Sequence, residues 1–409
     1  MGLGGNSTGL EDEGASPIPV TRRVVLYVHG FDPRGPGAYH RMFVEEAAKR
    51  IARGGAEIAV GPRRRLGQDG RWQVAATFTG EPETLTDWRF LRWDDAVRSL
   101  WTRGWRVYLD MWTSLVLYAR AGYFRSHWRT AWPSCVALIA PPVMWLLFWV
   151  ASLSVAIGPV WAARALAGPL GGSGVPALIA ATAAAAGVLV GARKLWRMID
   201  DALRLTWLSR SSVSILRAAQ GRCAVINAAA GRLAEAIAAA AREPGVDELM
   251  VIAHSQGAGV AVMALARALA NGGFDQKISF LTLGQTIGGW DQISGGTAFH
   301  HDLVTVLGDP RVFWLDVTSP SDGAATGRLD PGAAAPGARP GLVRRWPQFH
   351  LVLEPERFRR TRTRQFDYHF LYLSTMDRTG GYDVFRLTCG PDPLAGFERG
   401  WTSYRGEPS

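Results

Sequence analysis

Cysteine is scarce in this chain, with three among 409 residues, at positions 135, 223 and 389. No two of them form a CxxC pair or follow the spacing of a metal site, and a low, odd number is typical of a reducing compartment without disulfides. The start of the chain also lacks the basic and then apolar pattern of a secretory signal peptide. Residues 1–20 are instead rich in Gly, Ser, Pro and acidic residues, which predicts a disordered N-terminal segment and no cleaved signal peptide.

Charge is absent from two long stretches, residues 130–163 and 165–192, which contain no Asp, Glu, Lys or Arg. A membrane-spanning helix needs about 20 apolar residues, and the first stretch, with the run VMWLLFWVASLSVAI, exceeds that length. Pro141 and Pro142 should kink this helix or delay its start. The second stretch is richer in Ala, which contributes less to insertion. We expect a transmembrane hairpin over residues 133–192; the alternatives are a buried Ala-rich helix, a lid or a dimer interface.

Positive charge flanks the expected hairpin on its outer sides. Arg125 and Arg129 precede it, Arg193 and Lys194 follow it, and Arg164 alone lies between the two apolar stretches. The positive-inside rule then places both flanks in the cytoplasm and the short connection outside. The sequence thus predicts a multi-pass membrane protein whose remaining parts are cytoplasmic, in agreement with its few cysteines.

The chain as a whole is basic, with 45 Lys and Arg against 35 Asp and Glu and a net charge of +10. Such a balance favours an anionic partner, either a lipid surface or a nucleic acid. Many arginines are interleaved with tryptophans over residues 87–132, which we interpret as helices at a membrane interface. The alternative is helices on the protein body with Trp inside. No nucleic-acid partner is expected, because the sequence shows no RRM, OB or helix-turn-helix pattern.

Short apolar runs alternate with helical periodicity on both sides of this middle region. Residues 23–28 (RVVLYV) and 248–253 (ELMVIA) are typical of buried strands. Residues 39–53 have helical periodicity, residues 257–270 predict a helix of small residues, and residues 211–242 predict one long Ala-rich helix. This alternation predicts an α/β fold with a mostly parallel sheet and helices on both faces, interrupted by the hairpin.

The sequence VIAHSQGAG places a serine, Ser255, directly between an expected strand and an expected helix. A nucleophile on such a sharp turn requires small residues two positions away on each side, and Ala253 and Gly257 satisfy this requirement. The more frequent pattern is G-x-S-x-G, and alanine is small enough for the same turn. The amides at the start of the helix would face negative charge that develops beside the serine.

A second motif lies far upstream, where the strand VVLYV leads into His29, Gly30 and Phe31. Paired with AHSQG later in the chain, this HGF sequence resembles the oxyanion loop of the α/β-hydrolase superfamily, and the chain looks like a bacterial membrane-associated serine esterase or lipase. The resemblance covers residues 24–65 and 211–382. It implies a Ser–acid–His triad, no metal, no dissociable cofactor and a bacterial inner membrane as the location.

The resemblance also implies roles for the residues beside the nucleophile. The backbone N–H groups of Phe31 and Gln256 would form the oxyanion hole. His29 would be a structural residue of the loop rather than a base.

The acid and the base follow the serine in the order of this superfamily, Ser, then acid, then His. Asp322 lies in a loop just past an expected strand and is the favoured acid, with Asp316 at the end of that strand as the alternative. His369, in the segment QFDYHFLYL, is the favoured base, and His350 is the alternative. His369 would take the proton of Ser255, and Asp322 would fix the imidazole tautomer and stabilise its charged form.

These expectations combine into a membrane-anchored serine hydrolase that cleaves an ester of a lipid or lipophilic acyl substrate, with the bilayer as its other partner. The alternative is a catalytically inactive scaffold or binding protein that keeps the fold. The expected parts are a disordered segment (1–20), the first part of the hydrolase core (21–86), interfacial helices (87–132), the hairpin (133–192) and the second part of the core (193–409).

Overall fold

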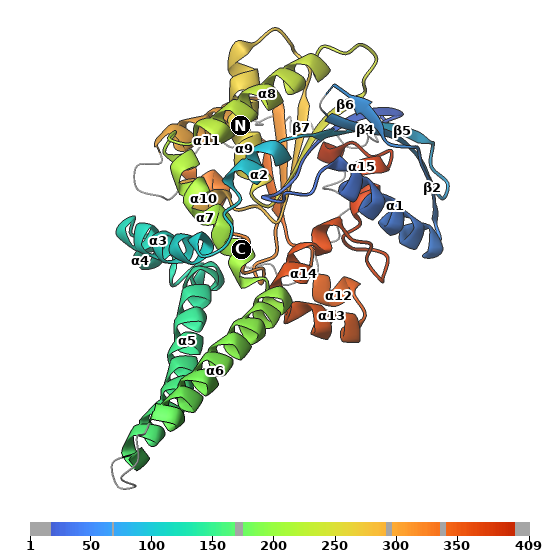
Figure 1. Cartoon of the computed structure of the whole chain (residues 1–409). Coiled ribbons are helices and arrows are strands. Elements are labelled where there is room, and N and C mark those ends of the chain that lie inside the picture. The colour runs from blue at the N-terminus through green and yellow to red at the C-terminus, as the bar shows by residue number, and fades with distance from the viewer. Residues whose placement is uncertain (1–17, 68, 168–174, 292–296, 336–340, 397–409) are drawn as a thin grey trace, which may run out of the picture.

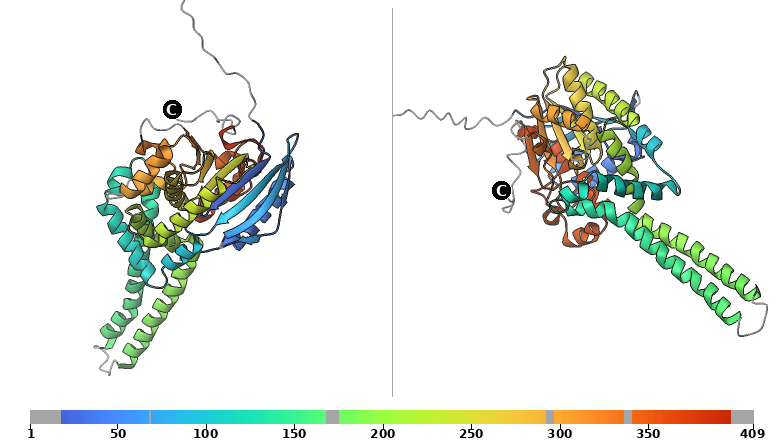
Figure 2. Two further views of the ribbon diagram at one scale, coloured as in Figure 1. Left: turned by 90° about the horizontal axis from the view of Figure 1, so that it is seen from above. Right: turned by 90° about the vertical axis from the view of Figure 1, so that its left-hand side faces the viewer.

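The computed structural model of the chain describes residues 18–67, 69–167, 175–291, 297–335 and 341–396. The disordered segment expected at residues 1–20 lies almost entirely outside them. A body built from one sheet and its covering helices carries a hairpin of two long helices that projects away from it (Figure 1). The projection is equally clear from two further directions (Figure 2).

Nine strands of the described residues form one mixed sheet, in the order β2–β4–β5–β1–β6–β7–β8–β9 with β3 paired to β4. From β5 to β9 in this order all neighbours are parallel, and β2, β3 and β4 add an antiparallel edge. The predicted α/β class with a mostly parallel sheet is therefore confirmed. The strands are β1 (Arg22–Val28), β2 (Ala56–Val60), β3 (Arg64–Leu66), β4 (Asp69–Phe78), β5 (Thr84–Leu91), β6 (Glu248–His254), β7 (Ile278–Leu283), β8 (Val312–Val317) and β9 (Leu342–Arg345).

Helices cover both faces of this sheet (Figure 2). They are α1 (Pro36–Ala52), α2 (Asp94–Leu100), α3 (Arg106–Arg120), α4 (Tyr123–His127), α5 (Trp132–Ala167), α6 (Val175–Leu203), α7 (Leu205–Ala219), α8 (Ala224–Ala240), α9 (Gly257–Asn271), α10 (Ile287–Asp291), α11 (Thr297–Gly308), α12 (Phe349–Val352), α13 (Pro355–Arg362), α14 (Gln365–His369) and α15 (Val384–Cys389), with the 3-10 turns η1 (Pro331–Ala334) and η2 (Leu371–Leu373).

Alternate residues of the central strands enter two separate hydrophobic cores. In β1, Val24 and Leu26 face one core, and Val25 and Tyr27 face the other. Helices α8, α9 and α11 pack into the first core, and α1 and α15 pack into the second. Helix α1, which follows β1, and helix α9, which follows β6, therefore lie on opposite faces. The carboxyl ends of β1 and β6 form the switch point at which open α/β sheets bind ligands.

The Trp/Arg-rich region differs from the expectation of helices alone, because its start belongs to strand β5. The alternation in TLTDWRFL places Trp88 in the sheet. Trp88 and Trp93 are buried, as in the alternative interpretation, whereas Trp105 and Trp128 are 67% and 51% exposed. The first part of this region thus builds the body, and helices α3 and α4 lie beside the start of the hairpin (Figure 1).

Helices α5 and α6 are the two described helices that are each long and apolar enough to cross a membrane. At about 1.5 Å per residue, their 36 and 29 residues extend about 54 and 44 Å, beyond the hydrocarbon core of about 30 Å. Only 11% and 6% of their most apolar segments is buried against protein. Helix α5 begins at Trp132, so Pro141 and Pro142 do not delay its start as expected, and both prolines are buried inside the helix. These features support membrane association.

The single long helix expected over residues 211–242 is divided into α7 and α8. Gly221, with φ of +71°, lies in the break between them, because a left-handed residue ends a helix and glycine adopts it without strain. Arg204, with φ of +54°, makes a similar turn between α6 and α7. The chain uses this second turn to pass from the hairpin back into the body.

Candidate active site

Ser255 lies between β6 and α9 with φ of +57°, in the left-handed region that residues other than glycine rarely adopt. Its N–H donates to the carbonyl oxygen of Leu283 (3.0 Å), and its own carbonyl oxygen accepts from the N–H of Ala258 (3.1 Å). Such strain persists only where the surroundings hold it, and it is often found at functional sites. The serine is thus fixed in a strained turn at the carboxyl end of a central strand.

The loop after β1 passes very close to this turn, because the neighbouring residues are small. A Cβ atom on Gly30 would lie 3.0 Å from the Cβ of Ser255 and 3.4 Å from its Oγ. A Cβ atom on Gly257 would lie 2.4 Å from the carbonyl oxygen of His29, closer than real contacts allow. Ala253, whose own Cβ is fully buried, fits between the strands. The two sequence motifs therefore meet in space, although more than 220 residues separate them.

Two backbone N–H groups at this junction are candidates for an oxyanion hole. Within the described residues, neither the N–H of Phe31 nor that of Gln256 has a hydrogen-bond acceptor. The Gln256 side chain is held by Thr286 Oγ1 (2.9 Å) and Trp290 Nε1 (3.0 Å), which both donate to its Oε1. The Phe31 ring stacks on Trp101. Both loops are therefore anchored by their side chains, which leaves the two N–H groups available to a ligand.

The structure brings His369 and Asp322 together. The Nδ1–H of His369 donates to Asp322 Oδ2 over 2.6 Å, and both side chains are fully buried. The same carboxylate accepts from the Tyr372 hydroxyl (3.1 Å), and its other oxygen accepts from the N–H of Ala324 (2.9 Å). Burial raises the pKa of Tyr372 well above its usual value, so its hydroxyl stays a donor. The carboxylate is thus placed to fix the tautomer and orientation of the imidazole.

The two alternative residues have other surroundings. Asp316, in β8, is buried and accepts hydrogen bonds from Thr282 Oγ1 (2.9 Å) and Thr318 Oγ1 (2.7 Å). Burial raises the pKa of this carboxyl, and no hydrogen bond or ion pair joins it to a histidine among the described residues. His350 is exposed on α12, where its ring contacts Phe358. The structure therefore places a buried carboxylate–imidazole pair only at the favoured positions within the described chain.

His254, the residue just before the serine, carries a contact that sequence reasoning missed. Its Nε2–H donates to the backbone carbonyl oxygen of His369 over 3.0 Å, and the two rings lie 4.9 Å apart. Burial lowers the pKa of His254 well below its usual value, which keeps the ring neutral. His254 therefore ties the strained turn at Ser255 to α14, the helix that carries His369. His254 belongs to the motif AHSQG, but nothing in this motif indicates that its hydrogen-bond partner is the carbonyl oxygen of His369.

His29 supports the loop that carries one oxyanion donor. It is fully buried, stacks face to face on Phe90 at 4.9 Å, and its Nδ1–H donates to the carbonyl oxygen of Gly30 (2.7 Å). The Trp93 indole N–H donates to the His29 carbonyl oxygen (2.7 Å). Burial lowers the pKa of His29 from 6.5 to about 4. These contacts give it the surroundings of a structural residue.

One contact of a working triad is not formed. Within the described residues, no hydrogen bond joins Ser255 Oγ to His369 Nε2, and this Nε2 is buried without a partner. Ser255 itself is only 4% exposed. Catalytic hydrogen bonds are often long in unliganded enzymes and tighten when substrate binds. Acyl transfer at this serine requires Ser255 Oγ and His369 Nε2 to come within about 3 Å of each other.

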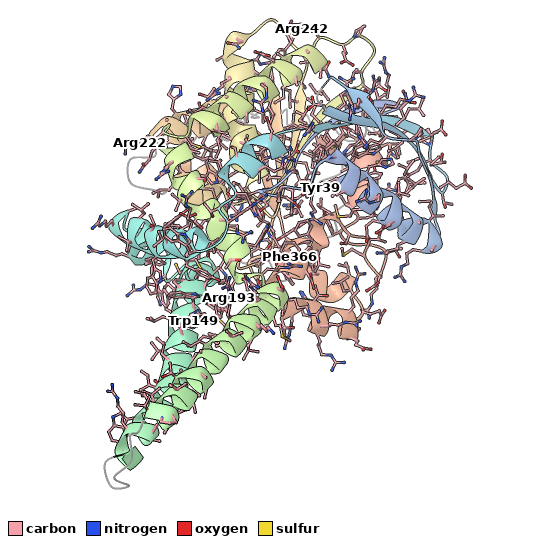
Figure 3. The ribbon with its side chains drawn as sticks, in the orientation of Figure 1. Tyr39, Trp149, Arg193, Arg222, Arg242 and Phe366 are labelled. Carbon is pink, nitrogen blue, oxygen red and sulfur yellow. The ribbon has the colours of Figure 1, made fainter. Side chains whose placement is uncertain are left out.

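Two cavities lie beside the Asp322–His369 pair. The larger, of about 710 Å³, lies at the start of the hairpin and is named the root cavity here. Its wall includes Ser321 and Gly323, on either side of Asp322, and residues 365–367, just before His369. Figure 3 shows one of these residues, Phe366, at the underside of the body where α6 ends.

The smaller cavity, of about 80 Å³, is lined by Gln256 and by residues 323–326, and is named the Gln256 cavity. Gly323 and Ala137 line both cavities, so only a thin wall separates them. Ser255 lines neither. The root cavity has the volume of a typical ligand site, about 300–1,000 Å³.

Comparison of the chain with protein families, with curated proteins and with solved structures finds no match. Within the described residues, no group of three or more His, Cys, Asp and Glu side chains is placed to hold a metal ion. The interpretation of the site therefore depends on its geometry.

Proposed function

We propose that the chain is a membrane-anchored serine hydrolase with an α/β-hydrolase-like core, which cleaves an ester of a lipid or lipophilic acyl substrate. The observation that supports this most is the buried His369–Asp322 pair beside a serine held at positive φ. A strained nucleophile turn, an oriented imidazole and free N–H groups form the arrangement that acyl transfer requires.

The proposed reaction has two steps. Ser255 Oγ attacks the acyl carbon while His369 Nε2 takes its proton, and the N–H groups of Phe31 and Gln256 hold the oxyanion. The protonated imidazole then gives its proton to the leaving alcohol, which forms the acyl-enzyme. A water molecule, deprotonated by the same nitrogen, attacks the ester and releases the acid and free serine. Asp322 acts through the imidazole as a positioning residue.

A fluorophosphonate probe tests the proposal, because it phosphonylates an activated serine. Full-length protein in mild detergent should be labelled at Ser255, and the Ser255→Ala variant should lose the label. The Ser126→Ala variant, which removes an exposed serine on α4, is the matched control and should be labelled like the wild type. Absence of labelling in folded wild type would contradict the proposal.

A non-catalytic scaffold with the same fold is the second candidate. The absent hydrogen bond between Ser255 and His369 favours it. It predicts that the probe leaves Ser255 unlabelled at every pH and that no ester is cleaved, in protein that unfolds cooperatively. The same labelling experiment therefore separates the two candidates.

The proposed location is a membrane, with both ends of the hairpin on the cytoplasmic side. The support is the positive charge at the flanks, Arg125, Arg129, Arg193 and Lys194. All three native cysteines are buried, so a new surface cysteine can be labelled on a low background.

Membrane-impermeant maleimide on intact cells tests this topology. Arg164→Cys, near the far end of α5, should be labelled from outside, and Arg125→Cys should be labelled only after the membrane is opened. The reverse pattern would contradict the orientation. Recovery of the protein in a high-salt wash without detergent would contradict membrane insertion itself.

A further inference from the structure

The root cavity has an apolar wall that belongs to the same helix as the first expected membrane span. Its α5 residues run from Trp132 to Pro141, and the apolar residues Leu203, Leu205 and Phe366 complete this side. An acyl chain that leaves the bilayer along α5 would therefore meet a continuous apolar surface up to the body.

The polar side of the root cavity is cationic on balance. Arg204, Arg328 and Arg364 line it, together with Asp201 and Asp367. The two ion pairs among them are long, 3.9 Å for Arg204–Asp201 and 3.7 Å for Arg364–Asp367, and their side chains are more than half exposed. Arg328 donates its Nε–H to a backbone carbonyl and has no carboxylate partner in the described chain. A group with negative charge is thus the complementary ligand.

The edge of the root cavity at Pro141 reaches the headgroup layer, and its arginines lie on the body side of that layer. The hydrocarbon core takes about 20 helical residues. Counted from Arg164 toward the body, that length ends near Met144, and counted from the start of α6 it ends near Leu195. Pro141, in the cavity wall, follows within one helical turn of Met144. Arg193, two residues before Leu195, lies in the same zone on α6 (Figure 3).

The root cavity also borders the proposed catalytic group. Residues on both sides of Asp322 and residues just before His369 form its wall. The Gln256 cavity, beyond Gly323 and Ala137, holds about two or three water molecules by volume. It is therefore large enough for a group the size of a carbonyl beside Gln256, and the wall at Gly323 and Ala137 separates it from the root cavity.

We propose that the root cavity binds an anionic glycerophospholipid of the bilayer, with its phosphate among Arg204, Arg328 and Arg364 and an acyl chain along α5. The proposal rests on the proposed function in one respect, since it names the substrate class that Ser255 acts on. The binding itself does not depend on turnover.

Binding to the full-length Ser255→Ala protein in neutral detergent tests the inference. The probes are dihexanoyl phosphatidylglycerol, dihexanoyl phosphatidylcholine and inorganic phosphate, each followed by calorimetry. A cationic contact at a membrane surface contributes about fivefold in affinity. We expect phosphatidylglycerol to bind at least about fivefold more tightly than phosphatidylcholine, and phosphate alone to bind far more weakly than either.

Arg328→Gln is the sharpest variant, because it breaks no ion pair. It should weaken phosphatidylglycerol binding about fivefold and phosphatidylcholine binding less, because the choline cation already repels the arginines that the shared phosphate would contact. Arg364→Gln should act in the same direction. Arg360→Gln, on the exposed face of α13 outside the cavity wall, is the matched control and should change neither affinity. Ala140→Trp, which fills the apolar wall, should weaken both lipids alike.

Three results would overturn the inference: equal affinity for the two lipids, phosphate that competes at the concentration of the lipid, or an equal loss in Arg360→Gln. Failure of the proposed function looks different, because Ser255 in the Arg328→Gln variant should still react with the fluorophosphonate probe. Selective lipid binding without a reactive serine would keep the lipid site and remove the hydrolase. A reactive serine without lipid selectivity would do the opposite.

Discussion

Acid should weaken the fold through His29 before it protonates most carboxylates. The buried ring takes up a proton only near pH 4, because burial lowers its pKa from 6.5 to about 4. The unfolded chain binds that proton already below about 6.5, so it binds more protons than the native state in this window. Stability must therefore fall as the pH falls from about 6.5 to about 4.

The size of the effect follows from the shift. Each pKa unit corresponds to about 1.4 kcal/mol, so His29 alone costs about 3 kcal/mol once the pH is below both values. Between about pH 7 and about pH 4.5 the loss is about 2 kcal/mol. His254, whose pKa is also lowered by burial, acts in the same direction, so only a comparison of variants isolates His29.

His29→Asn supplies that comparison, because its amide can replace the Nδ1–H donor to Gly30 but does not titrate. The variant should be less stable near neutral pH, since it loses the stacked ring, and should lose about 2 kcal/mol less than wild type on acidification. Urea unfolding in mild detergent, followed by tryptophan fluorescence, measures both. His350→Asn, which removes an exposed histidine, is the matched control variant. An acid loss in His29→Asn equal to that of wild type would refute the reasoning.

Three further substitutions test the site. Gly257→Ala should cost several kcal/mol or prevent folding, because its Cβ would lie 2.4 Å from the His29 carbonyl oxygen; a thermal unfolding curve measures this, and an unchanged curve would contradict it. His254→Phe should lower kcat/KM for a short ester about tenfold with a small effect on Tm, because the buried His369 carbonyl oxygen loses its donor. His254→Gln should restore part of the activity. Equal activity in the two variants would contradict a positioning role for His254. Asp322→Asn should lower kcat by several orders of magnitude and preserve the fold, because the imidazole loses the acceptor that fixes its tautomer; a modest change in kcat would remove Asp322 from the mechanism.

The features that depend only on residues close together in the sequence could be predicted from sequence patterns. The strand-to-helix turn at Ser255 was predictable because its motif combines an apolar strand, small residues and a helix within a few positions. The hairpin was visible because uncharged length is itself the physical requirement for a membrane span. Residues 84–91 were missed because Trp and Arg are typical of an interface, and the alternation of a strand was outweighed by composition.

Contacts between distant segments could not be predicted in the same way. The choice between Asp322 and Asp316 depends on a loop that turns one of them toward His369, and the two lie only six residues apart, at the end of β8 and just past it. The partner of His254 is a carbonyl group, which every residue carries, so no residue type signals it. The root cavity exists only because α5, α6 and α14 meet, and its lining residues lie far apart in the sequence.

The position of β1 within the sheet has a consequence for how the protein is made. One edge of β1 pairs with β5, and the other pairs with β6, which is synthesised only after both long apolar helices. At about 5–20 residues per second, the roughly 160 residues from β5 to β6 take about 8–30 s to emerge. During that time strands β1 to β5 have been made, and the edge of β1 that later pairs with β6 is still unpaired. Delivery of the nascent chain to the membrane and completion of the sheet are therefore ordered events, with the hairpin first.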